Sequence, residues 1–244
     1  MSLFLVLTFL FFVGSVAGWV LELFYRRFFS RNNPERKWIN PGFLTGPYLP
    51  LYGFSLVILF SLSHINVSFI KQPVLQKIVL FAVMALFITL FEYIAGLIFI
   101  KKMNIALWDY SKCWGNIQGI ICPQYTFYWW LLSGIYYFLI HPRILNWLYW
   151  FTNHISFSFV VGFFYGIICI DFCYSLQIMT KIRKYAKENQ VVIRLENLKN
   201  HIHSERIQRK EKSRFLFILR NDKEMVEETL KQYIKKIKDF NHLI

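Results

Sequence analysis

Long stretches of this sequence lack charge. Residues 1–180 contain only 11 Lys/Arg and 5 Asp/Glu, whereas residues 181–244 contain 17 and 9. Hydrophobic residues make up 56% of the chain, charged residues only 17%, and the mean hydropathy is +0.38. About a quarter of the residues of an ordinary soluble domain are charged. The deficit excludes such a domain and predicts a membrane domain at 1–180, followed by a charged tail at 181–244.

Cysteine is scarce, and the common catalytic motifs are missing. The four cysteines are too few and too scattered for a disulfide scaffold. There is no Gly-x-x-x-x-Gly-Lys-Ser/Thr sequence, so any ATP hydrolysis belongs to a separate subunit. His-Glu-x-x-His and Gly-x-Ser-x-Gly are also absent. His201 and His203 have no third ligand at metal spacing. We therefore expect no bound metal or cofactor, and the chain carries no signature of an enzyme.

Five apolar runs reach the roughly 20 residues that a helix needs to cross a bilayer. They cover residues 3–24, 43–63, 78–100, 117–140 and 155–179. These runs predict an all-α, polytopic helix bundle. The aromatic stretch 145–151, with Trp147 and Trp150, suits the membrane interface before the last span. A six-span alternative, in which 43–63 or 145–179 is split, remains open.

Basic residues between the runs predict an orientation. Segments 25–42, 64–77, 101–116 and 141–146 hold five, two, three and one Lys/Arg, and 17 follow residue 180. With five spans and an outside N-terminus, 25 of these bases are cytoplasmic and 3 are outside, as the positive-inside rule requires. We therefore expect a multi-pass protein of the cell membrane whose N-terminus is outside and whose C-terminus is cytoplasmic.

Three carboxylates lie within the apolar runs, while no Lys or Arg does: Glu22, Glu92 and Asp171. Ionisable groups at membrane depth are costly and usually face a polar cavity or a partner charge. Glu22 precedes Arg26 by one helical turn, so this pair could simply mark a helix end. Glu92 and Asp171 have no such local partner. All three acids are candidates for a substrate or ion site, and for Glu92 and Asp171 the alternative is a structural hydrogen bond.

A Pro/Gly-rich segment, Asn40 to Gly53, coincides with the start of the second run. Three prolines and three glycines after Asn40 interrupt helical hydrogen bonding, and irregular backbone at membrane depth needs protein or water to satisfy it. Transporters use such broken or re-entrant helices at their binding sites. The alternative is a loop that ends at Pro50, with a plain helix beyond it. The further site candidates of this segment are Asn40, Gly46, Pro47 and Tyr52.

Two other patterns lie in or between the runs. Gly14 and Gly18, like Gly162 and Gly166, are small-residue pairs that let helices approach closely. The segment 101–116 contains acidic, aromatic and amide side chains that could dock a partner or lie at the membrane interface: Trp108, Asp109, Tyr110 and Asn116.

Six motifs, in this order, resemble the bacterial putative ABC-transporter type IV permease family. They are Gly18-Trp19-x-x-Glu22, the Asn40–Gly53 segment, Glu92-Tyr93-x-x-Gly96, Trp108-Asp109-Tyr110, Asn116-x-x-Gly119-x-x-Cys122, and Pro142. The resemblance covers about residues 15–142. It implies a permease-like membrane protein and identifies Glu22, Glu92 and Asp109 as family positions. It reaches neither Asp171 nor the tail.

The tail carries two apolar stripes at helical spacing. The first, Val191, Leu195, Leu198 and Ile202, predicts that the last span continues as a helix. The second consists of Val226, Leu230, Tyr233, Ile237 and Phe240, with Asn221 and Glu224 as a capping box. Two stripes favour a hairpin or coiled coil. The net +8 of the tail favours protein contact or self-association through 185–244, or the anionic inner leaflet, over nucleic acid.

These observations predict a permease-like membrane subunit, embedded in the lipid bilayer, that works with a separate ATPase or another partner. Two other classes remain open. One is an intramembrane enzyme that acts on a lipid-linked substrate with a carboxylate as general base. The other is a scaffold or sensor that signals through its tail.

Overall fold

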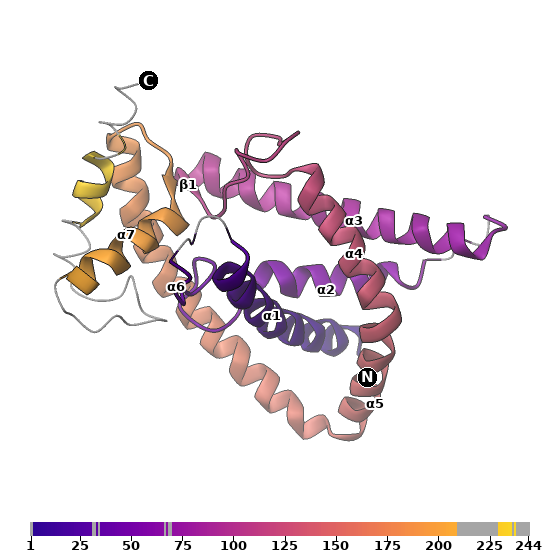
Figure 1. Ribbon diagram of the computed structural model, residues 1–244. Coiled ribbons are helices and arrows are strands. Elements are labelled where there is room, and N and C mark those ends of the chain that lie inside the picture. The colour runs from indigo at the N-terminus through magenta and orange to yellow at the C-terminus, as the bar shows by residue number, and fades with distance from the viewer. Residues whose placement is uncertain are drawn as a thin grey trace. The chain divides into compact units, whose positions relative to one another are not determined.

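The structure is a computed structural model that describes residues 2–30, 33, 35–65, 67, 70–208, 229–235 and 237. The elements follow in the order α1 (Leu3–Phe28), α2 (Pro50–Leu62), α3 (Pro73–Ile98), η1 (Phe99–Met103), β1 (Ile105–Ala106), α4 (Pro123–Ile135), η2 (Tyr136–Ile140), α5 (His141–Asn153), η3 (Ile155–Phe157), α6 (Ser158–Glu188), β2 (Ile193–Arg194) and α7 (Leu195–Gln208) (Figure 1). The predicted all-α class is confirmed.

The chain divides into two compact units. Unit 1 comprises Met1–Gly18, Leu49–Ala95 and Tyr110–Ile167, and unit 2 comprises Trp19–Tyr48, Gly96–Asp109 and Ile168–Ile244. These two units are defined by the contacts within the chain. The predicted boundary at residue 180 instead separates a membrane domain from a charged tail, and it stays a prediction.

Unit 1 is a helical assembly with an apolar, aromatic-rich core. The core includes Leu10, Met84, Ile88, Tyr136 and Phe151, each at most 2% exposed. Helices α2, α3 and α4 all begin with proline, whose missing N–H costs nothing in the first turn.

Helix α4 continues through η2 into α5 (Figure 1). The π-helical turn η2 ends at Ile140, two residues before Pro142. Proline cannot donate a main-chain hydrogen bond within a helix, and its ring clashes with the preceding turn. The wider turn of η2 accommodates this defect. In α5, Ile144, Leu148 and Phe151 face the core, while Trp147 and Trp150 are each 45% exposed. This exposure suits the predicted interfacial stretch, whose place in the membrane stays a prediction.

Unit 2 has its own apolar core, formed by the end of α6, a short parallel pair of strands and α7. Ile105 of β1 pairs with Ile193 of β2, and both side chains are 0% exposed. Leu198 of α7, and Leu230 and Ile234 of the helical segment 229–235, complete this core.

Three of the five predicted spans are long apolar helices. The helical stretches Leu3–Phe28, Pro73–Met103 and Ile155–Glu188 are long and apolar enough to cross a membrane. The run 43–63 becomes helical only at Pro50, so α2 has 13 residues, fewer than a full span needs. The run 117–140 becomes helical at Pro123 and continues into α5. Five crossings stay a prediction.

Two packing predictions need correction. The first tail stripe does not continue α6, because α6 ends at Glu188 and the backbone turns through Gln190, at φ +53°, into β2 before α7 begins. All four side chains of that stripe are nevertheless buried. Gly14 packs closely, with its Cα hydrogens facing Leu56, whereas Gly162 and Gly166 face open space within the described residues. Of the second stripe, Val226, Phe240 and the capping box lie outside the described residues.

Candidate functional site

Asp171 on α6 receives five hydrogen-bond donors within unit 2, and its side chain is 8% exposed. Four of the donors belong to the segment just before α2: the Thr45 N–H (3.2 and 3.0 Å to the two oxygens), the Thr45 hydroxyl (2.5 Å), the Gly46 N–H (2.8 Å) and the Tyr48 hydroxyl (2.6 Å). The fifth is the Ser175 hydroxyl, one turn further along α6, at 3.0 Å. All five are uncharged, and together they bind the segment to α6.

The local sequence lets the backbone wrap around this carboxylate. Gly42 has φ +76°, a left-handed conformation that favours glycine. A Cβ on Gly46 would overlap the ring of Tyr48, so only glycine allows the ring to fold back toward the carboxylate. The bends at 42–47 keep the amides of Thr45 and Gly46 out of any helix. Those amides remain available to Asp171.

The start of the same segment is held by Asn40 and Lys199. The Asn40 side chain, 3% exposed, accepts a hydrogen bond from the Trp19 indole (2.6 Å) and donates to the carbonyls of Leu44 and Thr45 (3.1 and 3.0 Å). The Lys199 amine, from α7, donates to the carbonyls of Asn40 (2.9 Å) and Gly42 (2.6 Å). We call residues Asn40–Tyr48 the clasped loop, because α6 and α7 each bind it.

Lys199 is an unusual base. It is 5% exposed, and burial lowers the pKa of its ammonium from 10.5 to about 7. The charge of Arg26 lowers this pKa further, whereas Glu196 opposes the shift. The amine therefore exchanges its proton near neutral pH.

Glu22 forms the ion pair that its spacing predicts. Its carboxylate lies 2.8 Å from the guanidinium of Arg26, which also lies 3.3 Å from Glu196 of α7. This three-residue group links α1 to α7 within unit 2. The arrangement agrees with the interpretation of Glu22 as a structural partner of Arg26.

Glu92 is the acidic centre of unit 1. Its side chain on α3 is 3% exposed and accepts hydrogen bonds from the Tyr110 hydroxyl (3.0 Å) and the Trp129 indole (3.0 Å). The ring of Tyr110 stacks on that of Tyr125 at 4.0 Å between centroids. Next to Trp129 lies Tyr52, at 5.6 Å between ring centroids. Glu92 therefore lies among aromatic side chains that carry polar groups.

The remaining predicted site residues make other contacts. Pro47 is exposed, and it belongs to the clasped loop without contributing a polar side chain. Tyr52 packs against Gly18 in unit 1. Asp109 forms an ion pair with Arg194 at 3.1 Å. The Asn116 side chain closes its own turn by bonding the carbonyls of Ser111 and Cys113 and the Gly119 amide. Trp108 is half-buried. Partner docking by these residues stays a prediction.

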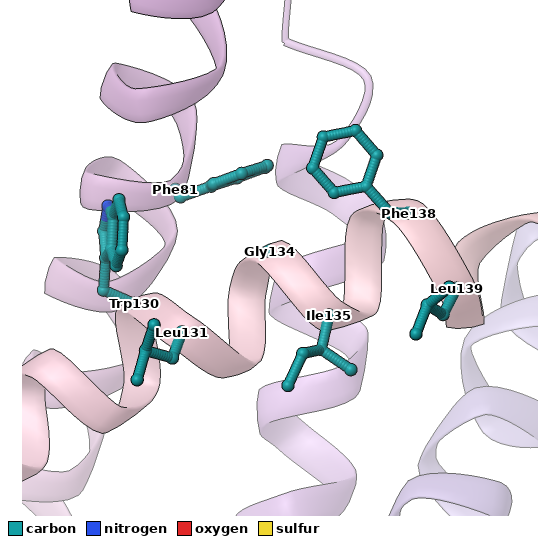
Figure 2. Close-up of a pocket in the computed structure, with 7 residues that line it drawn as sticks. All are labelled: Phe81, Trp130, Leu131, Gly134, Ile135, Phe138 and Leu139. Atoms are coloured by element: carbon teal, nitrogen blue, oxygen red, sulfur yellow. The ribbon is translucent and has the colours of Figure 1, made fainter.

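A pocket of about 380 Å³ lies elsewhere in unit 1 (Figure 2). It is lined by Phe81 of α3 and by apolar residues of α4 and η2, including Trp130 and Phe138. The ring of Phe81 lies 5.8 Å from that of Phe138 and 6.4 Å from that of Trp130. These side chains offer no charge to a substrate. Within the described residues, no group of three or more His, Cys, Asp or Glu side chains could hold a metal ion.

Comparison with protein families identifies the chain. The family model described as "Putative ABC-transporter type IV" matches residues 9–176. The chain belongs to this family. The ABC-transporter type IV match contains Glu22, Glu92 and Asp109, as the resemblance implied, and extends to Asp171, which the resemblance did not reach. Comparisons with curated proteins and with solved structures gave no match.

Sequence reasoning identified the acids of this ABC-transporter type IV chain but missed most of their partners. Thr45, Tyr48 and Ser175 are too common in type to stand out, and only their contacts with Asp171 reveal them. Lys199 lies beyond the family match, in a tail with many other bases. One signal was present: Lys199 directly follows Leu198 of the first apolar stripe, so it lies beside the buried face of α7.

Proposed function

We propose that this chain is the membrane-embedded, permease-like component of a transporter and that it works with a separate nucleotide-hydrolysing subunit. The observation that carries the proposal is the family match over residues 9–176 in a chain whose described residues form three helices long enough to cross a membrane. The chain has no phosphate-binding Gly-x-x-x-x-Gly-Lys-Ser/Thr sequence, which supports placing hydrolysis on another polypeptide.

Within this chain, we propose Glu92 as the group that binds a proton or a cation during transport. A buried carboxylate in an apolar helix is costly and often marks an ion or proton path. The Tyr110 hydroxyl, at 3.0 Å, can donate to ionised Glu92 and can accept from its protonated form. Both protonation states therefore retain a hydrogen bond. Asp171 suits this role less well, because two backbone amides and three hydroxyls already bind its oxygens.

The substitution Glu92→Gln tests the role of this carboxylate. It keeps size and polarity but removes the titratable group. We expect the variant, expressed in a strain that lacks the native gene, to support transport-dependent growth at least about tenfold less well than the wild-type protein. The amount of protein in the membrane should be unchanged. A loss of this size is usual for an essential proton-transfer group. Glu35→Gln is the matched control, because the Glu35 side chain is 62% exposed. Full complementation by Glu92→Gln would overturn the proposed role of Glu92.

The partner is tested separately. We expect the tagged chain, purified from its native membrane in mild detergent, to retain a stoichiometric subunit that carries the nucleotide-binding motif, and the complex to hydrolyse ATP. Mass spectrometry and phosphate release provide the two measurements. A stable, active chain with no such subunit would overturn the transporter proposal. It would then favour an intramembrane enzyme or a scaffold.

A further inference from the structure

The clasped loop joins Asp171, in the apolar helix α6, to α7 of the predicted cytoplasmic tail. At one end, the amides of Thr45 and Gly46 bind Asp171 in the apolar part of α6. At the other end, the carbonyls of Asn40 and Gly42 bind Lys199 in α7. Helix α6 therefore binds amide N–H groups of the clasped loop, and helix α7 binds carbonyl oxygens of the same loop.

Lys199 is costly to replace at this position. Its amine is the donor to two carbonyls that lie in a buried setting, since Asn40 is 3% and Lys199 is 5% exposed. A buried carbonyl that loses its hydrogen-bond donor destabilises the folded protein. An apolar side chain at position 199 would therefore leave the start of the clasped loop without its bonds to α7.

Helix α7 is itself held by charge. Arg26 of α1 bonds Glu196 of α7 and Glu22 of α1, and both Arg26 and Glu196 act on the ammonium of Lys199. The clasped loop contributes no charged side chain to this group. Besides the core contacts of Leu195, Leu198 and Ile202, an ion pair with Arg26 thus ties α7 to α1, and the bonds of Lys199 depend on the position of α7.

We propose that α7 controls the clasped loop through Lys199: a displacement of α7 withdraws the amine from the Asn40 and Gly42 carbonyls and frees the loop to move. The biological role of this coupling rests on the proposed transporter function: through α7, the nucleotide-hydrolysing partner would act on the membrane domain. Its physical content is a coupling between two segments of this chain and does not depend on what is transported.

Hydrogen–deuterium exchange of the purified full-length chain tests the coupling. We expect Lys199→Met to speed amide exchange in residues 40–48 about tenfold or more, while exchange in 124–135 of α4 stays unchanged. Lys184→Met is the matched control, because Lys184 is exposed on α6. Lys199→Arg keeps a cationic donor and should restore much of the protection. Unchanged exchange in 40–48 of a folded Lys199→Met protein would overturn the proposal.

A second variant weakens the attachment of α7 while the Lys199 side chain stays in place, although it also removes a negative charge that raises the pKa of Lys199. Glu196→Gln removes the ion pair with Arg26, so exchange in α7 and in residues 40–48 should rise together. If exchange in α7 rises and that in 40–48 does not, the coupling is refuted even where Lys199→Met fails to fold. Because exchange needs neither substrate nor partner, these outcomes stay distinct from failure of the transporter proposal.

Discussion

At the scale of single residues, Asp171 acts as the acceptor that fixes the clasped loop. We expect Asp171→Asn to destabilise the protein strongly, because an amide presents a donor where five donors converge. Each buried donor left without an acceptor costs about 1–3 kcal/mol. The apparent thermal midpoint in detergent measures this change.

Ser175→Ala is the matched comparison for Asp171→Asn. It removes one donor at 3.0 Å and leaves the other four, so it should cost only about 1 kcal/mol. Equal midpoints for the two variants would mean that the carboxylate does not hold the loop.

The lowered pKa of Lys199 predicts how the stability of the protein depends on pH. Burial lowers this pKa from 10.5 to about 7, so between these values the unfolded chain binds more protons at this position than the folded chain. Stability should therefore rise with pH across this window, by up to about 1.4 kcal/mol per pH unit from this residue alone. Below pH 7 both states are protonated and the contribution of Lys199 to the slope vanishes.

The measurement compares thermal midpoints of the wild type and Lys199→Met from pH 6.5 to 9.5. Other groups titrate in both proteins, so the difference between the two curves isolates Lys199. The advantage of the wild type over the variant should grow with pH. A difference that is constant with pH would contradict the lowered pKa.

The sequence revealed the acids at this scale because a charge inside an apolar run is conspicuous. It did not reveal their donors, since Thr45 and Asp171 are 126 positions apart and no periodic pattern relates them. The Glu22–Arg26 pair was predictable because one helical turn separates its members. Local chemistry could thus be predicted, whereas contacts made by tertiary folding could not.

At the scale of elements, the two glycine pairs look alike in sequence but differ in packing. A Cβ on Gly18 would overlap the Cβ and Cγ of Tyr52, whereas a Cβ on Gly162 meets nothing within 4 Å in the described residues. We expect Gly18→Ala to destabilise by about 1–3 kcal/mol through overpacking. Gly162→Ala should stabilise by up to about 1 kcal/mol, because alanine is the better helix former.

Thermal midpoints of the two glycine variants in detergent provide the measurement. Opposite signs are expected. A shift of both variants in the same direction would show that local helix propensity or a further packing partner, and not the contact with Tyr52, decides the outcome.

Element boundaries were predictable where proline marks them. Pro73 and Pro123 begin helices, and so does Pro50, as in the alternative that placed a plain helix after the loop. The strand β2 between α6 and α7 was not predictable, because the stripe from Val191 to Ile202 keeps helical spacing across it. Burial against a common core requires only that these side chains face one way. A strand followed by a helix achieves this as well as one continuous helix.

At the scale of the whole molecule, charge predicts an arrangement in the membrane that helix length leaves open. Among the described residues, three apolar helices are long enough to cross a membrane, while α2 is too short to cross unaided. If α2 crosses together with the irregular residues before it, Glu35 and Lys71 lie on opposite sides of the membrane. If the segment enters and leaves on one side, they lie together.

Single cysteines in an otherwise cysteine-free chain distinguish these arrangements. Glu35, Lys71, Trp114, Asn153 and Lys184 are all exposed and lie in different predicted segments. With five crossings and an outside N-terminus, an impermeant maleimide should label Lys71→Cys and Asn153→Cys in intact cells. Glu35→Cys, Trp114→Cys and Lys184→Cys should react only after the membrane is permeabilised. This is the arrangement that places 25 of the 28 Lys/Arg residues in the cytoplasm, as the positive-inside rule favours. Labelling of Glu35→Cys and Lys71→Cys under the same condition would instead make α2 re-entrant. An even number of crossings would then require one terminus to change sides.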